Sequence, residues 1–184
     1  FVASTTIEGL LITKENCKDF LEFYRSNYLD VDNDPLYPFG YGLSYTEFEY
    51  GNLKADTSVS TSDRFVTVSF EVTNTGSVAS DEVAQIYVSP TEEGQNIRPI
   101  QLQGFARVSL QPAETKTVKV RLNTEQFGYY TNDGVRQWNI APGSFLIKVG
   151  ASSADIRLTD TVTLTGKHVT KPLREYYFSE TEVI

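Results

Sequence analysis

The stretch Phe65-Val-Thr-Val-Ser-Phe-Glu-Val-Thr-Asn74 decides the fold of this 184-residue chain. Apolar and polar residues alternate along it, and the side chains of a β-strand point to opposite faces with the same period of two. One face of the segment is therefore predicted to be buried and the other to meet water. The Asn74-Thr-Gly76 that follows tolerates the positive φ angles of a turn, so we expect the strand to end there.

The same alternation recurs along the rest of the chain, separated by turn residues. Seven or eight short strands in this arrangement predict an all-β fold, an immunoglobulin-like or fibronectin type III-like β-sandwich. The chain has a single cysteine, Cys17, which can form neither an internal disulfide nor a metal cluster, so fibronectin type III-like is the better description. The expected strands are Thr46–Leu53, Phe65–Asn74, Glu82–Ser89, Gln101–Leu110, Thr115–Asn123, Val135–Ile140, Ser144–Gly150 and Ile156–Thr165.

Two positions within this pattern predict local features. Asn132-Asp-Gly134, between Tyr129 and Trp138, has the composition of a tight hairpin turn. Asp160 falls on the inward-facing side of the last expected strand, which predicts a bulge or kink there, with a paired or edge-exposed aspartate as the alternative.

Charge and composition exclude several function classes. The formal net charge is -8, which argues against a nucleic-acid partner because such proteins need clustered Lys and Arg. No stretch approaches the roughly 20 apolar residues that cross a bilayer, so no membrane partner is expected. Neither a glycine-rich phosphate loop nor a Cys-x-x-Cys pair is present, and no cofactor is expected.

Few residues suggest chemistry. Asp30-Val-Asp-Asn-Asp34 resembles the start of a calcium loop, but Pro35 and Tyr41 stand where the loop needs Gly and Glu, so no metal site is expected. His168, the only histidine, has no nucleophile in its sequence neighbourhood and is interpreted as a surface residue. No catalytic residue is assigned.

Aromatic residues are abundant. We expect one group to fill the sandwich core and its hairpin edges, although exposed rings could instead stack on sugars. The members of this group are Phe105, Phe127, Tyr129, Tyr130 and Trp138.

Pro35-Leu-Tyr-Pro-Phe-Gly-Tyr-Gly-Leu-Ser-Tyr-Thr46 forms a connection between two parts of the chain. Its prolines disfavour helix and its glycines permit tight bends. The aromatic residues of this segment are the candidates for an interface with a neighbouring domain: Tyr37, Phe39, Tyr41 and Tyr45.

Seven motifs, in order, together resemble the C-terminal region of the family 3 glycoside hydrolases, the enzymes of β-glucosidase and β-xylosidase type. The resemblance covers about Tyr28 to Leu158. Its motifs are Pro35–Thr46, Val72-Thr-Asn-Thr-Gly76, Glu82-Val-Ala-Gln-Ile-Tyr-Val88, Arg98-Pro-Ile100 with Gln103-Gly-Phe-Ala-Arg-Val108, Leu110-Gln-Pro-Ala-Glu-Thr-Lys-Thr-Val118, Pro142-Gly-Ser-Phe145 and Val149-Gly-Ala-Ser-Ser153.

The resemblance implies a parent enzyme that retains configuration at a β-linked sugar, with its nucleophilic Asp in a barrel and its acid/base Glu commonly in a second, α/β domain. Ser62-Asp63 and Ser80-Asp81 do not match the nucleophile segment of the family, so neither catalytic role is carried onto this chain. This chain is then expected to be a non-catalytic accessory domain of such an enzyme, with a carbohydrate-binding or assembly module as the alternative.

The resemblance and the residue pattern together predict a domain organisation, in which Phe1–Lys14 and the tail from Lys167 have no counterpart in the family. Residues 1–34 would be a remnant of the preceding α/β domain or a foreign segment, 35–45 the aromatic junction, 46–166 the sandwich and 167–184 a C-terminal tail that docks on the sandwich or on a partner. The expected partners are the catalytic domains, with self-association through Phe20–Tyr50 as a further possibility. The location implied is periplasmic or extracellular.

Overall fold

The computed structural model describes residues 6–7, 10–11, 35–91, 100–131 and 137–184, and it is almost entirely β-structure. Two compact units are present, Phe1–Leu36 and Tyr37–Ile184. Within the first unit, β1 (Thr6–Ile7) pairs antiparallel with β2 (Leu10–Leu11). Cys17 and the acidic Asp30–Asp34 lie outside the described residues, as does most of the predicted 1–34 remnant.

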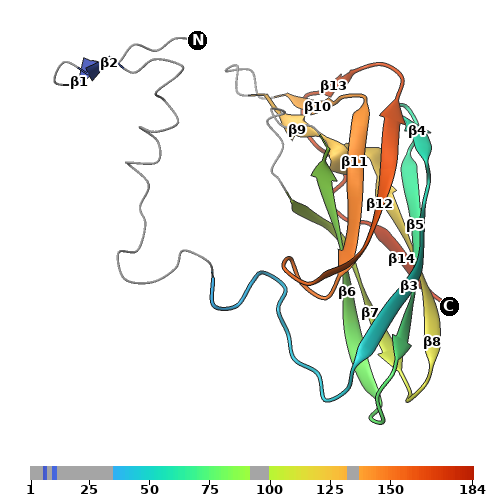
Figure 1. Cartoon of the computed structure of the whole chain (residues 1–184). Coiled ribbons are helices and arrows are strands. Elements are labelled where there is room, and N and C mark those ends of the chain that lie inside the picture. Colours follow the sequence, from blue (N-terminus) through green and yellow to red (C-terminus); the bar gives the residue numbers. More distant parts are fainter. Residues whose placement is uncertain (1–5, 8–9, 12–34, 92–99, 132–136) are drawn as a thin grey trace. The chain divides into compact units, whose positions relative to one another are not determined.

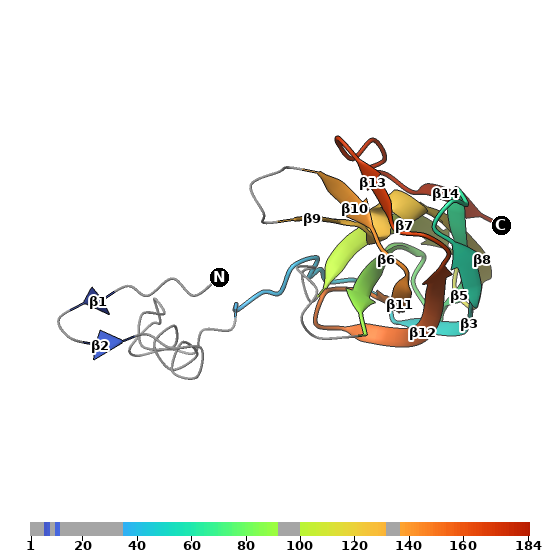
Figure 2. The same cartoon turned by 90° about the horizontal axis from the view of Figure 1, so that it is seen from above.

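The second unit is a sandwich of two sheets, with a small third sheet at one end (Figures 1 and 2). The predicted all-β sandwich is confirmed. One sheet has the order β4-β12-β11-β6-β7, formed by Ser58–Ser60, Ile156–Thr165, Gly143–Gly150, Ser80–Pro90 and Gln101–Leu110. The other has the order β14-β8-β5-β3, formed by Glu180–Val183, Thr115–Asn123, Phe65–Asn74 and Phe48–Ala55. The small sheet has the order β13-β10-β9, formed by Val169–Lys171, Trp138–Ile140 and Tyr129–Tyr130.

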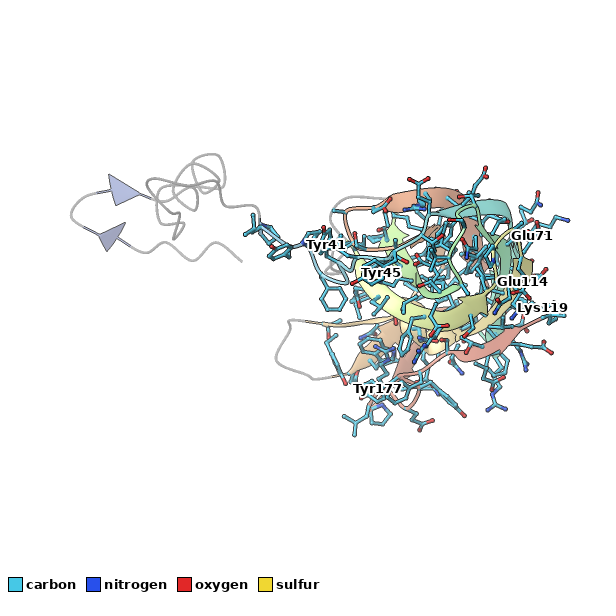
Figure 3. The ribbon with its side chains drawn as sticks, turned by 90° about the horizontal axis from the view of Figure 1, so that it is seen from below. Tyr41, Tyr45, Glu71, Glu114, Lys119 and Tyr177 are labelled. Atoms are coloured by element: carbon cyan, nitrogen blue, oxygen red, sulfur yellow. The ribbon has the colours of Figure 1, made fainter. Side chains whose placement is uncertain are left out.

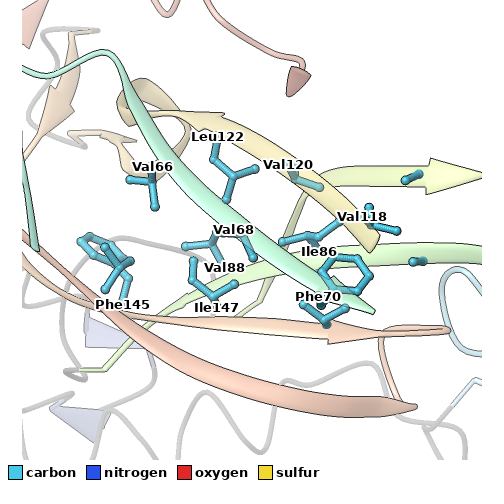
Figure 4. Packing of buried hydrophobic residues seen from close by; sticks show 14 of the residues in the cluster. Val66, Val68, Phe70, Ile86, Val88, Val118, Val120, Leu122, Phe145 and Ile147 are labelled. Atoms are coloured by element: carbon cyan, nitrogen blue, oxygen red, sulfur yellow. The ribbon is translucent and has the colours of Figure 1, made fainter. Parts of the chain in front are cut away.

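The alternating residues of the central strands form the core between the two sheets. Val66, Val68 and Phe70 of β5 face Ile86 and Val88 of β6, and all are nearly inaccessible to water (Figure 4). Fully burying one such side chain contributes about 1.5–3 kcal/mol, so this row of residues makes a large favourable contribution that offsets the entropy lost on folding. Strands β5, β7, β8 and β12 begin and end at the predicted residues.

Other predictions hold in part. The β9 and β10 strands pair antiparallel, Tyr130 with Trp138, as the hairpin prediction requires, while its turn at 132–136 lies outside the described residues. The first sandwich strand, β3, starts at Phe48 rather than Thr46, because the preceding backbone bonds elsewhere: the carbonyl of Glu47 accepts from the N–H of Thr75 at 2.9 Å.

The predicted bulge at Asp160 is wrong. Asp160 pairs in regular register with Ile147, and the irregularity of this ladder falls at Val149 and Gly150 instead. The aspartate does point inward, half-buried, and its Oδ2 accepts the backbone N–H of Ala55 at 3.0 Å. Asp160 is therefore accommodated by a hydrogen bond and not by a kink, and this is the paired aspartate given as the alternative in the sequence prediction.

The C-terminal residues join the sheets as β13 and β14. A buried carboxylate holds the segment between these strands: Glu125, in the 3₁₀ helix η1 (Thr124–Phe127), binds the ammonium of Lys171 and accepts the backbone N–H groups of Glu175 at 2.8 Å and Tyr176 at 3.2 Å. Burial favours the neutral form of Glu125, but these hydrogen bonds outweigh it and hold the pKa of the carboxyl below its ordinary value.

Candidate functional site

The four candidate interface residues lie on the surface of the sandwich unit. Tyr37, Phe39, Tyr41 and Tyr45 are 67%, 66%, 47% and 96% exposed, although side chains of this size are normally buried in a monomeric domain. The rings of Tyr37 and Tyr41 are 5.3 Å apart and tilted by 38°. Figure 3 shows Tyr41 and Tyr45 on the opposite side of the sandwich from Glu71.

The backbone of this segment is fixed to the outer face of a sheet. Gln85, a buried residue of β6, donates from Nε2 to the carbonyls of Gly40 at 2.9 Å and Ala151 at 2.6 Å. The carbonyl of Phe39 accepts the N–H of Ser153 at 2.9 Å. The exposed rings are thus carried on an ordered backbone, which lowers the entropic cost of any contact they make.

Gly40 is required where it stands. Its φ of +79° lies in the left-handed region, and a Cβ built on it would come 2.0 Å from Oε1 of Gln85. The same oxygen accepts the hydroxyl of Tyr87 at 2.5 Å, and burial raises the pKa of this tyrosine, so the phenol stays a donor. All polar atoms of the Gln85 side chain are therefore oriented by their partners.

An open groove of about 830 Å³ lies between the segment and the sheet. Apolar side chains from both sides line it, among them Phe39, Leu43, Val83, Leu102 and Phe105. Val83 and Phe105 come from β6 and β7 and are 43% and 57% exposed. The prediction that Phe105 fills the core is wrong, because it pairs with Gln85 and shares the outward face with it, whereas Phe127 and Trp138 are buried as expected.

Charged residues also line the groove, among them Glu82, Asp155 and Arg157. The hydroxyl of Tyr50 donates to Glu82 at 2.6 Å, and burial together with this bond to a carboxylate raises the pKa of the tyrosine far above its ordinary value. Arg157 forms an ion pair with Asp155 at 2.9 Å, donates to the carbonyl of Phe48 and lies 5.1 Å from the ring centre of Tyr50. The hydrogen bond from Arg157 holds the pKa of Asp155 below its usual range.

No catalytic residue was predicted for this chain. His168 lies on the surface, as predicted, with Nε2 2.9 Å from Oδ1 of Asn139. Within the described ranges, no group of three or more His, Cys, Asp or Glu residues could hold a metal ion. Val83 and Gln85 were not predicted as site residues. They alternate with Ala84 and Ile86, whose side chains point into the core, so their own side chains point outward.

Comparison with known proteins gives a consistent match. The family profile of the fibronectin type III-like domain matches residues 82–153. A β-xylosidase from Formosa agariphila is 42% identical over 149 residues, which cover 81% of this chain and 20% of the relative. A periplasmic β-glucosidase from Salmonella typhimurium is 37% identical over 135 residues, covering 73% of this chain and 17% of the relative.

Solved structures agree with the sequence relatives. The structure of β-glucosidase 3B from Thermotoga neapolitana in complex with glucose superposes with a TM-score of 0.66 at 29% identity, covering 75% of this chain and 18% of that one. The chain thus spans about a fifth of the length of the proteins that it matches.

Proposed function

We propose that this chain, with its fibronectin type III-like domain, belongs to the family 3 glycoside hydrolases and is a non-catalytic accessory domain that packs against the catalytic domains of such an enzyme. The observation that carries the proposal is the exposed aromatic segment from Tyr37 to Tyr45, held on an ordered backbone beside the outward-facing Val83 and Phe105. A contiguous exposed apolar surface of this kind marks an interaction site.

The parent enzyme would hydrolyse terminal β-linked sugars of plant-type oligosaccharides. Support comes from the relatives, which are named β-xylosidase and β-glucosidase. Its location would be periplasmic or extracellular, as the name of the Salmonella typhimurium relative suggests, and among the described residues no helix could span a membrane. Fractionation of the native host with antibody against this chain tests the location, and signal in the cytoplasmic fraction would contradict it.

The accessory role is tested in a full-length enzyme. Residues 37–184 replace the matching stretch of the Formosa agariphila β-xylosidase, which shares 42% identity with this chain. We expect the hybrid to hydrolyse an aryl β-xyloside and to lose activity on heating sooner when Phe39, Tyr41 and Tyr45 are all changed to Ser.

Two controls make the result specific. The same triple change in the isolated 184-residue chain should leave its melting temperature unchanged within about 2 °C, because the three side chains are exposed and surface substitutions cost about 0.5 kcal/mol or less. The isolated chain should show no turnover. The proposal would be contradicted if the hybrids with and without the triple change had equal heat resistance, or if the isolated chain hydrolysed the substrate.

The same exposed surface could also mediate self-association of the chain. Without a partner domain, the exposed rings from Tyr37 to Tyr45 would bring two copies of the chain together at high concentration. Sedimentation at rising concentration tests this, and a strict monomer throughout would exclude it.

A further inference from the structure

The groove beside the aromatic segment has an excess of negative charge. Four carboxylates line it, from Glu47, Asp81, Glu82 and Asp155. Asp81 is paired with Arg107, and Asp155 is paired with Arg157.

The remaining two carboxylates lack an ion pair within the described part of the chain. The hydrogen-bond partner of Glu82 is the phenol of Tyr50, a neutral group whose raised pKa keeps it in the donor form. Arg157 is near enough to interact with Glu82, but its ion pair is with Asp155. Glu47 is exposed, with no side-chain hydrogen bond or ion pair to the described residues.

The floor of the groove is apolar in the same place. Val83 and Phe105 lie on the outward face of β6 and β7, and Phe39 and Leu43 of the segment line the same groove. A partner with only charged residues would leave this floor in water, and a purely apolar partner would bury the two unpaired carboxylates at a cost. The combination therefore selects a mixed partner.

We propose that the groove receives a segment of the catalytic part of the enzyme that carries a leucine or aromatic side chain flanked by arginine or lysine. This inference rests on the proposed accessory role and specifies the chemistry of the partner. The relatives are about five times longer than the matched stretch, so such a segment has ample chain to come from. A second copy of this chain, with its net charge of -8, complements the groove poorly.

Arginine suits the site better than lysine. Its planar guanidinium can bind a carboxylate such as that of Glu47 through two parallel hydrogen bonds, and it can also stack on an exposed aromatic ring of the groove such as Phe105. The apolar neighbour of the arginine then covers Val83 and Leu102. Charge fixes the register of the contact, and the apolar floor supplies the affinity.

The test uses the intact 184-residue chain, labelled with ¹⁵N, and two blocked peptides, acetyl-Arg-Leu-Phe-Arg-amide and acetyl-Glu-Leu-Phe-Glu-amide. We expect the basic peptide to shift the amide resonances of Val83 and Phe105 and to bind about 10-fold more tightly than the acidic one. Raising NaCl from about 50 to about 500 mM should remove most of the difference, because the pairs at this open site are screened by salt.

Charge variants localise the effect. Glu47→Gln combined with Glu82→Gln should bring the two peptides to within about 2-fold of each other. The matched control, Glu49→Gln combined with Glu182→Gln, removes the same charge from exposed positions outside the groove and should preserve the preference. Equal binding of both peptides, no binding of either, or resonance shifts confined to another face would overturn the inference.

Failure of the partner chemistry and failure of the accessory role give different results. If the triple aromatic variant lowers the heat resistance of the hybrid enzyme while the peptides bind without charge preference, the domain docks through its rings and the proposed partner chemistry is wrong. If the triple aromatic change leaves the heat resistance of the hybrid enzyme unchanged, the accessory role itself is contradicted.

Discussion

Replacing Glu125 with Gln tests how the C-terminal segment is held to the sandwich. The substitution keeps the size of the side chain but removes its charge and turns one oxygen into an NH₂ group. The Glu125 side chain is only 3% exposed, and its carboxylate oxygens accept from the Lys171 ammonium and from two backbone N–H groups. All of these partners are donors, so the NH₂ group of a glutamine would point at a donor and could not form a hydrogen bond with it. We expect the segment from Lys171 to Tyr176 to lose its anchor.

The magnitude follows from these contacts. A hydrogen bond to a charged group contributes about 1.5–3 kcal/mol. The glutamine oxygen can still accept some of the hydrogen bonds that Glu125 accepts. Lys171 is one-third exposed, so water can solvate its ammonium once the ion pair is lost. The expected loss is therefore about 2–3 kcal/mol in the free energy of unfolding. For a chain of this length, that corresponds to a decrease of about 4–12 °C in melting temperature.

The pH dependence gives a second readout. The folded-state pKa of Glu125 lies below its ordinary value of 4.5, so its stabilising contribution is present above pH 4.5 and is lost as the pH falls toward the folded pKa. The difference between wild type and Glu125→Gln should be complete at neutral pH and shrink in acid. Thermal unfolding followed by circular dichroism measures both, and hydrogen exchange of β14 reports whether the segment opens locally.

Glu180→Gln is the matched control, because Glu180 pairs with Arg121 at 2.8 Å on the exposed β14 and an exposed pair contributes about 0–1 kcal/mol. The reasoning about Glu125 fails if its variant melts within about 1 °C of wild type with unchanged exchange of β14, or if a measured difference is the same at neutral pH and in acid.

Two further substitutions examine the groove. Gly40→Ala must adopt a φ of +79° and meet Gln85, and we expect a loss of about 1–3 kcal/mol by urea unfolding, whereas Gly42→Ala, with no atom within 4 Å of the new Cβ, should cost less than about 0.5 kcal/mol; equal losses would contradict the account. Tyr50→Phe removes the donor to the Glu82 carboxylate and should cost about 1–2 kcal/mol, so an unchanged urea midpoint would show that this bond contributes little.

The parts of the fold that could be predicted are those in which burial imposes a period. In β5, and in β8 from Val118 to Leu122, every second residue is buried against the opposite sheet, and this alternation predicted both strands. β14 could not be found in this way, because all four of its residues are exposed and its backbone pairing with β8 leaves no trace in the sequence.

The candidate site also has parts that the sequence predicted and parts that it did not. The exposed rings of the junction were predictable from composition, but the groove required knowing that Val83 and Phe105 face the same side as Gln85. Glu125 was missed because nothing in its neighbours indicates burial, although the spacing from Asn123 to Gln126 matches the capping box that the structure contains.

The groove has a consequence for the order of folding. Its walls come from four regions of the chain, ending with Arg157, whose side chain reaches the carbonyl of Phe48 across 109 positions. Contacts between residues so far apart are entropically costly to form and depend on the rest of the sheet being in place. The groove is therefore absent from any partly folded sandwich, and a partner that recognises it would dock only with copies that have finished folding.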